Sequence, residues 1–568
     1  MENQRFFLYI ALAFLLYIIW LTWQQEHAPA PVAQQGDSQV ADINQNGTAA
    51  SNNYDNSADL PDALDATSSA AAAATQQSTA TAATQNKSQK IHVRTDVLDV
   101  IIDTRGGDIR QVDLPTYPVS LEKQDEAFRL LHSNNRTYIA QSGLRHDKVN
   151  GQAVAGVAPT HHEVYRAQQS EYLLNEGQDE LNVTLQWDGE NGIKVEKIYT
   201  FYRDSFVFDI KHRVTNKGDS TWIGRQYQQL RHSPISESRS WLRLPTYTGT
   251  AYFDGGYHKH SFGDIEDEPI NLQVEGGWVA VLQHYFVSAW VPEGDEENRF
   301  YSKTVNAGGE QQLLIGMLSN AKTVAPNTSV EFNRRLYTGP KTQDKMKKIA
   351  KGLDLSVDYG MFSIISKPLF WLLKWFYNLV GNWGLAIILV TMVIKLIFYK
   401  LSETSYKSMA RMRKLQPRIK ALQERYADDK QKLGQATWEM YRKEKVNPAK
   451  GCLPILIQMP VFLALYWVLI ESVELRQAPF MLWIHDLSLR DPIFVLPFLM
   501  GISMYVQFKL NPAPPDPMQA KIFAMMPIMM TLFMAFFPAG LVLYWLVNNI
   551  LSIIQQYIIT KRIENEKF

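Results

Sequence analysis

The sequence has almost no cysteine: Cys452 is the only one in 568 residues. A single cysteine excludes a disulfide framework within the chain, and it argues against a thiolate zinc site, which needs several cysteines. Because Cys452 lies at the start of an apolar run, we interpret it as a small buried hydrophobic residue rather than a redox centre.

The chain also lacks an excess of charge of either sign. Lys plus Arg and Asp plus Glu number 57 each, so the overall charge gives no reason to expect a specific nucleic-acid partner. No phosphate-binding G-x-x-x-x-G-K-[ST] segment is present, which argues against an ATPase of that type. We expect neither a cofactor nor a metal ion.

Long apolar segments, by contrast, are abundant. Residues 6–23 are uncharged, just long enough to cross a bilayer, and end in tryptophans suited to the membrane interface. A cleaved signal peptide is the alternative, since Ala28–Ala30 resembles a cleavage site. The apolar run is longer than the core of a signal peptide, so we expect an uncleaved anchor over residues 1–26.

A polar segment of restricted composition follows the expected anchor. Residues 27–90 are rich in Ala, Gln, Ser, Thr, Asn and Asp, and residues 68–85 contain only Ala, Gln, Ser and Thr. Such a composition cannot bury enough apolar surface to offset chain entropy. The sequence therefore predicts a flexible tether outside the cytoplasm.

Alternating apolar and polar residues begin near residue 91. Residues 182–217 hold three such stretches, two of them joined by the turn Gly189–Gly192. The pattern recurs as far as residue 340 with little helical periodicity. The sequence predicts a large antiparallel β-sandwich over residues 91–345.

The rest of the chain is typical of a helical membrane domain. Residues 346–382 contain a linker and an amphipathic pattern over 362–380 that indicates a helix lying in the membrane interface. Five apolar runs follow within residues 383–560: 384–401, 453–470, 492–509, 522–537 and 540–559. Together with the anchor they predict six transmembrane crossings.

Basic residues gather in one of the short loops. Residues 402–448 are rich in Lys and Arg, whereas the opposite loop, 471–491, has only two basic residues. The positive-inside rule therefore places 402–448, both termini and the tail 561–568 in the cytoplasm, and the β domain in the periplasm.

The basic loop is itself patterned. Its apolar spacing predicts a helical hairpin projecting into the cytoplasm. Its charge is either a solvated face near anionic lipids or a docking surface for a ribosome or client. The candidate docking residues are Arg411, Arg413, Lys414 and Arg418.

Lys395 is a charged residue inside the apolar run 384–401. An ionised side chain at membrane depth costs at least about 2.5 kcal/mol. One interpretation is that it snorkels to the cytoplasmic surface, about 9 Å away. Another is a wet cavity, because Thr391 lies one turn away on the same face and Gln458 adds a polar group on the next run. An ion pair with Glu471 or Glu474 is less expected, because both residues lie towards the side of the membrane opposite to the cytoplasmic end near Lys395.

Several segments of the helical part resemble the YidC/Oxa/Alb family of membrane insertases: Asn447-Pro448, Gly451–Tyr466, Ser472–Phe480, Trp483–Leu487, Asp516–Met518 and Phe537–Tyr544. Gly276–Ala280 and the short anchor extend the resemblance to the Gram-negative YidC branch. The resemblance implies a five-helix insertase core and a periplasmic β-supersandwich similar to sugar mutarotases, without known catalysis.

The resemblance also implies a hydrophilic groove that is closed outward and open to the cytoplasm and the lipid. Lys395 matches its intramembrane basic residue, which is usually Arg in this branch. Lys keeps the charge but lacks the bidentate geometry of Arg. Five other positions match residues that line the groove: Thr391, Gln458, Phe536, Tyr544 and Trp545. Two of them depart from the family pattern, because Phe536 stands where Trp is expected and Trp545 where Tyr is expected.

The expected function is that of a membrane protein insertase and chaperone of the bacterial inner membrane, not an enzyme. Its expected partners are nascent membrane proteins, the ribosome, the Sec translocon and anionic lipids, and it works alone or beside the translocon. A secondary transporter that uses Lys395 as a coupling site is one rival, but it predicts inverted repeats and broken helices, which we do not see.

A tethered periplasmic enzyme acting on carbohydrate is the second rival, because β-sandwich domains also occur in such enzymes. Its best candidates are histidines, for which we see no partnering carboxylate in the sequence and which we interpret as exposed or hydrogen-bonded loop residues: His161, His162, His258 and His260.

Overall fold

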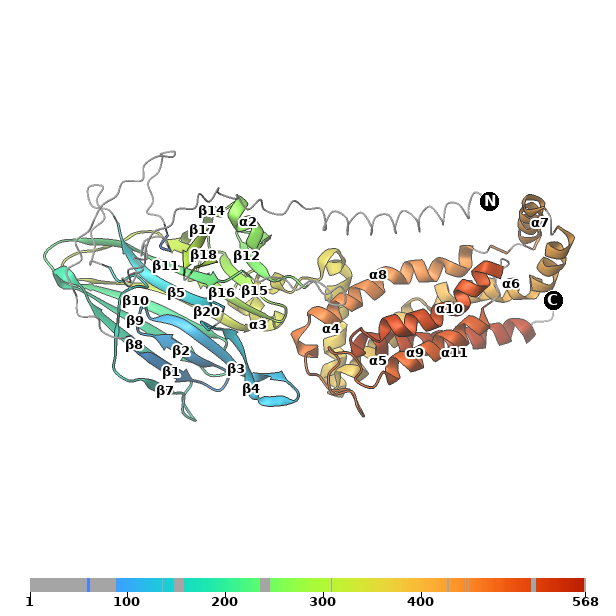
Figure 1. Ribbon diagram of the computed structural model, residues 1–568, viewed down its shortest axis with the longest axis horizontal. Coiled ribbons are helices and arrows are strands. Elements are labelled where there is room, and N and C mark those ends of the chain that lie inside the picture. Colours follow the sequence, from blue (N-terminus) through green and yellow to red (C-terminus); the bar gives the residue numbers. More distant parts are fainter. Residues whose placement is uncertain are drawn as a thin grey trace, which may run out of the picture.

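Strands and long helices occupy opposite ends of the molecule's long axis (Figure 1). The expected anchor and most of the expected tether lie outside the residues that this computed structural model describes. A β domain, residues 88–340, is followed along the chain by a helical domain, residues 341–565. The described residues are 59–61, 88–134, 136–147, 158–234, 246–307, 309–426, 429–444, 446–447, 449–511 and 517–565.

Two sheets form the β domain. The first has eleven strands in the order β14-β17-β18-β11-β5-β3-β2-β1-β7, with β4 beside β3 and β19 beside β11. Its strands are β1 Lys90–Arg94, β2 Asp99–Asp103, β3 Asp108–Ser120, β4 Lys123–Leu131, β5 Tyr138–His146, β7 Glu171–Leu173, β11 Trp222–His232, β14 Asn271–Glu275, β17 Glu297–Ala307, β18 Glu310–Ser319 and β19 Lys322–Val324.

The second sheet has nine strands in the order β13-β12-β15-β16-β20-β10-β9-β8-β6. Neighbours β8, β9, β10 and β20 pair antiparallel, whereas β1 and β7 of the first sheet run parallel. The strands are β6 Arg166–Ala167, β8 Glu180–Asp188, β9 Ile193–Tyr202, β10 Val207–Asn216, β12 Gly249–Phe253, β13 Tyr257–His260, β15 Trp278–Leu282, β16 Phe286–Pro292 and β20 Ser329–Pro340.

Strand β9 shows how the sequence sets the core of this domain. Ile193, Val195, Tyr199 and Phe201 are buried, and most of the residues between them are at least partly exposed. This is the period of two expected for a strand with one face on a core. Buried residues of both sheets belong to one cluster, so the domain is a β-sandwich, as the sequence predicts.

Short helical elements interrupt the strands. Helix α2, Phe262–Asp267, begins with a capping box in which Ser261 Oγ accepts from Asp264 N–H and Asp264 accepts from Ser261 N–H. It is too short to show helical periodicity, so a helix at this position is not predictable from the sequence pattern. A 3₁₀ turn, η1 Glu190–Gly192, lies between β8 and β9.

The helical domain contains nine helices among the described residues, with α7 at the end farthest from the sheets (Figure 1). They are α3 Gln343–Ile349, α4 Ser363–Val380, α5 Trp383–Ile397, α6 Tyr399–Arg425, α7 Lys430–Lys443, α8 Ala449–Glu471, α9 Val495–Leu510, α10 Pro517–Met534 and α11 Ala539–Asn565. Three 3₁₀ turns accompany them: η2 Leu353–Ser356, η3 Gly360–Phe362 and η4 Val473–Leu475.

By length and apolar composition, one described helix can cross a membrane unaided, over Ala539–Arg562 of α11. Helices α5 and α6 together pass the same test but are bent by 68° between Ile397 and Tyr399. The apolar run 384–401 is therefore divided between two helices rather than forming one straight helix. Three shorter apolar stretches lie in α8, α9 and α10: Leu456–Glu471, Val495–Leu510 and Ala520–Met534.

Polar contacts join the two domains at the turn after α8. Arg476 Nη2 donates to the carbonyl of Pro118 at 2.6 Å, and the guanidinium lies 5.8 Å and 5.7 Å from the ring centroids of Phe128 and Phe286. His284 Nε2 donates to the carbonyl of Ile470 at 3.0 Å. Burial lowers the pKa of His284 to about 4, so the ring donates as a neutral imidazole near neutral pH.

Gly277 is a position where the fold admits only glycine. Its φ is 75°, and a Cβ there would lie 2.1 Å from the carbonyl oxygen of Phe253. Gly294 has a similar φ of 66° but open space around the Cβ position. We expect Gly294→Ala to cost about 1–2 kcal/mol from backbone strain alone, and Gly277→Ala at least about 2 kcal/mol more because the chain at Phe253 must shift.

Urea unfolding of the purified full chain in detergent, followed by tryptophan fluorescence, measures this difference. Equal losses for the two alanine variants would show that the contact with Phe253 relaxes freely.

Candidate functional site

Lys395 lies in the last turn of α5. The helix begins at Asn382, whose side chain accepts a hydrogen bond from Leu385 N–H at 3.0 Å. The Lys395 side chain is buried, and its Nζ donates to Ser552 Oγ of α11 at 2.7 Å. Ser552 in turn donates to the carbonyl of Asn548 at 2.7 Å. The ammonium group is therefore directed at α11.

Thr391 is fully buried on α5, one turn before Lys395. Its hydroxyl donates to the carbonyl of Ile387 at 2.7 Å, which is a bond within its own helix. The hydroxyl proton is therefore already used within the helix. Thr391 shares a helix face with Lys395 but has no hydrogen-bond donor left for the site.

A buried polar face runs along α11, and the sequence analysis missed it. Asn549 donates to Ser503 Oγ of α9 at 3.1 Å, and Gln556 donates to Asn511 Oδ1 at 2.9 Å. Together with Ser552 they recur at spacings of three and four residues, so they share one face of the helix. The same spacing is visible in the sequence of the last apolar run, 540–559, and could have predicted this polar face.

The other candidate groove residues lie on two helices and in the turn that joins α10 to α11. Tyr544 is buried, and its ring stacks on Phe462 of α8 with centroids 6.0 Å apart. The neighbouring Trp545 meets the same ring edge-on at 4.7 Å. Gln458 lies one turn before Phe462 and is half-buried, and Phe536, in the turn after α10, is 50% exposed. The structure thus brings Tyr544 and Trp545 to the face of α8 that carries Gln458.

The acidic residues weighed as partners of Lys395 do not contact it. Glu471 ends α8, and Glu474 lies in η4 on the side of the β domain. Burial raises the pKa of Glu474 to about 7. Among the described residues, no carboxylate forms an ion pair with Lys395, and the Ser552 hydroxyl is its polar partner.

The candidate docking residues of the basic loop all lie on α6 and are exposed: Arg411, Arg413, Lys414 and Arg418. Arg418 Nη1 donates to Glu444 Oε1 at 2.8 Å and so joins α6 to the residue after α7. Such an exposed ion pair contributes little stability, about 0–1 kcal/mol. The basic charge of α6 is therefore available to solvent and partners.

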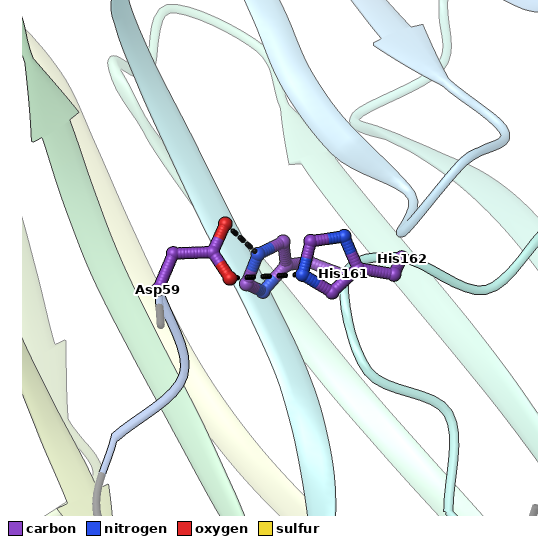
Figure 2. Close-up of side chains that lie close together, drawn as sticks. All are labelled: Asp59, His161 and His162. Atoms are coloured by element: carbon purple, nitrogen blue, oxygen red, sulfur yellow. Dashed lines mark hydrogen bonds and ion pairs between the residues drawn. The ribbon is translucent and has the colours of Figure 1, made fainter. Parts of the chain in front are cut away.

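Three of the four candidate histidines, His161, His162 and His258, do have carboxylate partners, so the interpretation that they lack them is wrong for these three. The Asp59 carboxylate faces both His161 and His162, with Oδ–Nε2 distances of 3.0 Å and 2.9 Å (Figure 2). His258 pairs with Asp254 at 3.0 Å. The first pairing escaped sequence reasoning because the partner is about a hundred residues away in a segment without periodicity.

Asp59, His161 and His162 also form the one group of described residues whose donor atoms lie close enough, within 4.8 Å, to surround a metal ion. Arg231 Nη1 lies 3.3 Å from Asp59 Oδ2. Its positive charge would repel a cation at this position. The electrostatics therefore favour the hydrogen-bonded arrangement over a metal centre.

Replacing Ser552 by Ala removes the acceptor of the buried Lys395 ammonium. We expect a loss of about 1–3 kcal/mol in the unfolding free energy of the helical domain, because a charged donor is left without its partner. Thr391→Val is the matched control and should cost less, since that hydroxyl bonds only within α5. Unfolding in mixed micelles with increasing SDS measures both, and equal losses would contradict the assigned partnership.

Two family models match successive parts of the chain. Residues 90–372 match the family model of the YidC periplasmic domain, and residues 375–566 match that of the 60Kd inner membrane protein. A crystal structure of an active YidC insertase with its first transmembrane domain resolved is 19% identical, with a TM-score of 0.38, and the match covers 85% of this chain and 94% of that chain. That TM-score is low, so the assignment rests on sequence.

Curated relatives cover the full length of the chain. The membrane protein insertase YidC of Thioalkalivibrio sulfidiphilus is 50% identical over 564 residues, 99% of both chains. The protein of the same name from Nitrosococcus oceani is 47% identical over 571 residues, 100% of both chains. This chain therefore belongs to the YidC family of membrane protein insertases, in the Gram-negative branch with a large periplasmic domain.

Proposed function

We propose that this protein inserts and folds membrane proteins in the bacterial inner membrane, and that clients pass a hydrophilic groove beside Lys395. The observation that carries the proposal is an ammonium group buried between apolar helices, bonded to a neutral hydroxyl rather than to a carboxylate. A charge that served only stability would be expected to have an opposite charge as partner.

An unneutralised ammonium acts on a client by electrostatic attraction. In surroundings of low dielectric constant its potential extends farther than in water. An acidic residue on a translocating tail is attracted to it, and the membrane potential adds about 2.3 kcal/mol per charge for each 100 mV. The apolar part of the client then enters the lipid, which releases about 0.8 kcal/mol per buried CH₂. No covalent step is needed for this work.

Polar groups beside Lys395 support a hydrated path. The Oε1 atoms of Gln555 and Gln556 on α11 are buried and accept no hydrogen bond from the described residues. Buried polar atoms of this kind are costly unless water or a client reaches them. We assign the groove lining to these side chains together with the residues that the family resemblance implies: Thr391, Gln458, Phe536, Tyr544 and Trp545.

The proposed topology has six crossings, with both termini in the cytoplasm and the β domain in the periplasm. Large apolar side chains on α8, α9 and α10 face outward, as for lipid contact: Leu456, Phe498 and Ile528 are 59%, 62% and 66% exposed. In α4, Ile364 and Trp371 are 88% and 67% exposed, as expected for a helix lying in the membrane interface. Residues 383–560 then form the five-helix insertase core.

The hairpin of α6 and α7 is the proposed receiving surface in the cytoplasm. Exposed basic residues on α6 suit acidic clients, ribosomal RNA at the exit site or anionic lipid headgroups, all of which carry negative charge. We propose that the ribosome and the Sec translocon are partners for some clients, and that others are inserted without them.

The effect of the Lys395 charge on insertion efficiency should depend on the charge of the client's translocated tail. Lys395→Arg should insert clients nearly normally, because charge and length are kept. Lys395→Ala should lower insertion of a client with an acidic translocated tail by about tenfold, the equivalent of about 1.4 kcal/mol, and Lys395→Glu should lower it further by repulsion. A client with an uncharged tail should be affected less.

Protease protection of paired clients that differ only in tail charge measures this effect. Lys395→Leu is the discriminating variant, since a lysine that merely snorkels predicts normal or better insertion. If the Leu variant and the wild type inserted both clients equally, the groove charge would have no role.

The hairpin should act as a whole rather than through one side chain. Removing residues 405–440 should abolish insertion, because the receiving surface is lost. Single substitutions such as Arg413→Ala should reduce insertion less than about fivefold, because an exposed charge in water contributes about 1 kcal/mol or less. The deletion variant with a Gly/Ser linker, checked for correct membrane localisation, is tested in the same assay. Normal insertion by it would reduce the hairpin to a connector.

A further inference from the structure

Three residues from the middle of the expected tether lie against the β domain. Asp59 makes the charged contacts of this segment, because one carboxylate oxygen faces His161 and the other faces His162 (Figure 2). Arg231 Nη1 adds a third cationic or donor group, 3.3 Å from Asp59 Oδ2. One side chain of the tether thus occupies a pocket of hydrogen-bond donors supplied by the β domain.

The backbone of the same segment is also recognised. Gln229 Nε2 donates to the carbonyl of Asp59 at 3.2 Å, and Lys303 Nζ donates to the carbonyl of Leu60. Backbone contacts of this kind fix the direction of a bound peptide as well as its charge. The segment is therefore held by main chain and side chain together.

Apolar contacts continue from the charged end of the segment. Leu60 packs against a small cluster formed by Tyr227, Tyr301 and Leu318. Pro61 lines a shallow pocket that Tyr301 and Leu318 also line. The site thus presents donors for a carboxylate next to an apolar surface for the two following residues.

The donors are preorganised by the β domain itself. Tyr227 Oη accepts a hydrogen bond from His161 N–H at 2.9 Å and lies 2.7 Å from His161 Nδ1. Because its oxygen already accepts the backbone N–H, its own proton is available to Nδ1, and the Nε2–H group of the ring then faces Asp59. The buried ring is therefore set to recognise an anion.

The electrostatics of the site also favour an anion over a metal ion. Burial alone would raise the pKa of the Asp59 carboxyl, but the hydrogen bonds from His161 and His162 outweigh it and hold the pKa below its ordinary range. Arg231 beside the carboxylate adds to the positive potential.

We infer that Asp59–Pro61 is a docking motif, and that the surface it occupies is a peptide-binding site of the β domain for an ionised aspartate followed by apolar residues. We call that surface, formed by His161, His162, Tyr227, Gln229, Arg231 and Lys303, the aspartate socket. Its occupant in this chain is Asp59–Pro61 itself.

Docking at this point has a mechanical consequence. Asp59 lies halfway along the expected tether, so its attachment shortens the chain between the anchor and the β domain by about half. The reach of a polar linker grows with its length, so an empty socket lets the domain move farther from the anchor.

A labelled peptide of residues 55–65 tests the inference on the full chain in detergent, by fluorescence anisotropy. In the wild type, the tethered segment competes at an effective concentration in about the millimolar range, so binding should be weak. Asp59→Ala and Leu60→Asp should each tighten the apparent affinity at least tenfold by emptying the socket. Both changes lie outside the β domain, so its own sequence stays intact.

Matched peptides and a socket variant define the chemistry. A peptide with Asp59→Asn should lose binding at least tenfold, whereas one with Asp62→Asn, the same charge change three residues along, should bind like the parent. Adding Arg231→Gln to the Asp59→Ala chain should weaken binding.

Two results would overturn the inference. One is equal peptide binding by the wild type and both emptied variants. The other is stoichiometric binding of Zn²⁺ to the wild type, lost in Asp59→Ala, without peptide binding to that variant, which would make the three residues a metal site.

Discussion

An ionised ammonium group held among apolar helices is the constraint on which the helical domain depends. The Lys395 side chain is buried, so the helix beside it must supply a polar partner, and Ser552 of α11 does so at 2.7 Å. The partner is neutral, so the positive charge persists. The polar face of α11 continues about one turn before and one turn after Ser552, through Asn549 and Gln556, and extends the polar surroundings of the charge. The contact between α5 and α11 at this level, and the proposed groove charge, thus depend on one buried residue.

The β domain contacts both the helical domain and a short segment of the expected tether. Arg476 and His284 connect it to the turn after α8, which fixes its position over the helical domain. Asp59 holds the segment that leads from the expected anchor. Helices α6 and α7 extend to the end of the molecule farthest from the β domain (Figure 1). The two ends of the protein can therefore serve different partners.

The sequence was sufficient for the broad architecture because its signals are local. A period of two, as in β9, predicts a sandwich strand, and long apolar runs predict membrane helices whatever they contact. Long-range pairing has no such signal. The Asp59–His161 contact joins residues far apart in the chain, and the 68° bend between α5 and α6 has no proline or glycine to announce it. Within the candidate site, Lys395 was evident from its charge alone. Its partner Ser552 was not, since serine is common in membrane helices.

The central claim is that a client passes the groove beside Lys395, and site-specific photocrosslinking to a stalled nascent membrane protein tests it most directly. A crosslinker at Gln458 or Phe536, which are partly exposed on the proposed groove side, should capture the client as its first apolar segment emerges. A crosslinker at Leu379, which is exposed on α4 in the proposed interface, serves as the matched control and should capture lipid or nothing. Equal capture from the groove and control positions, or none from the groove, would contradict the account.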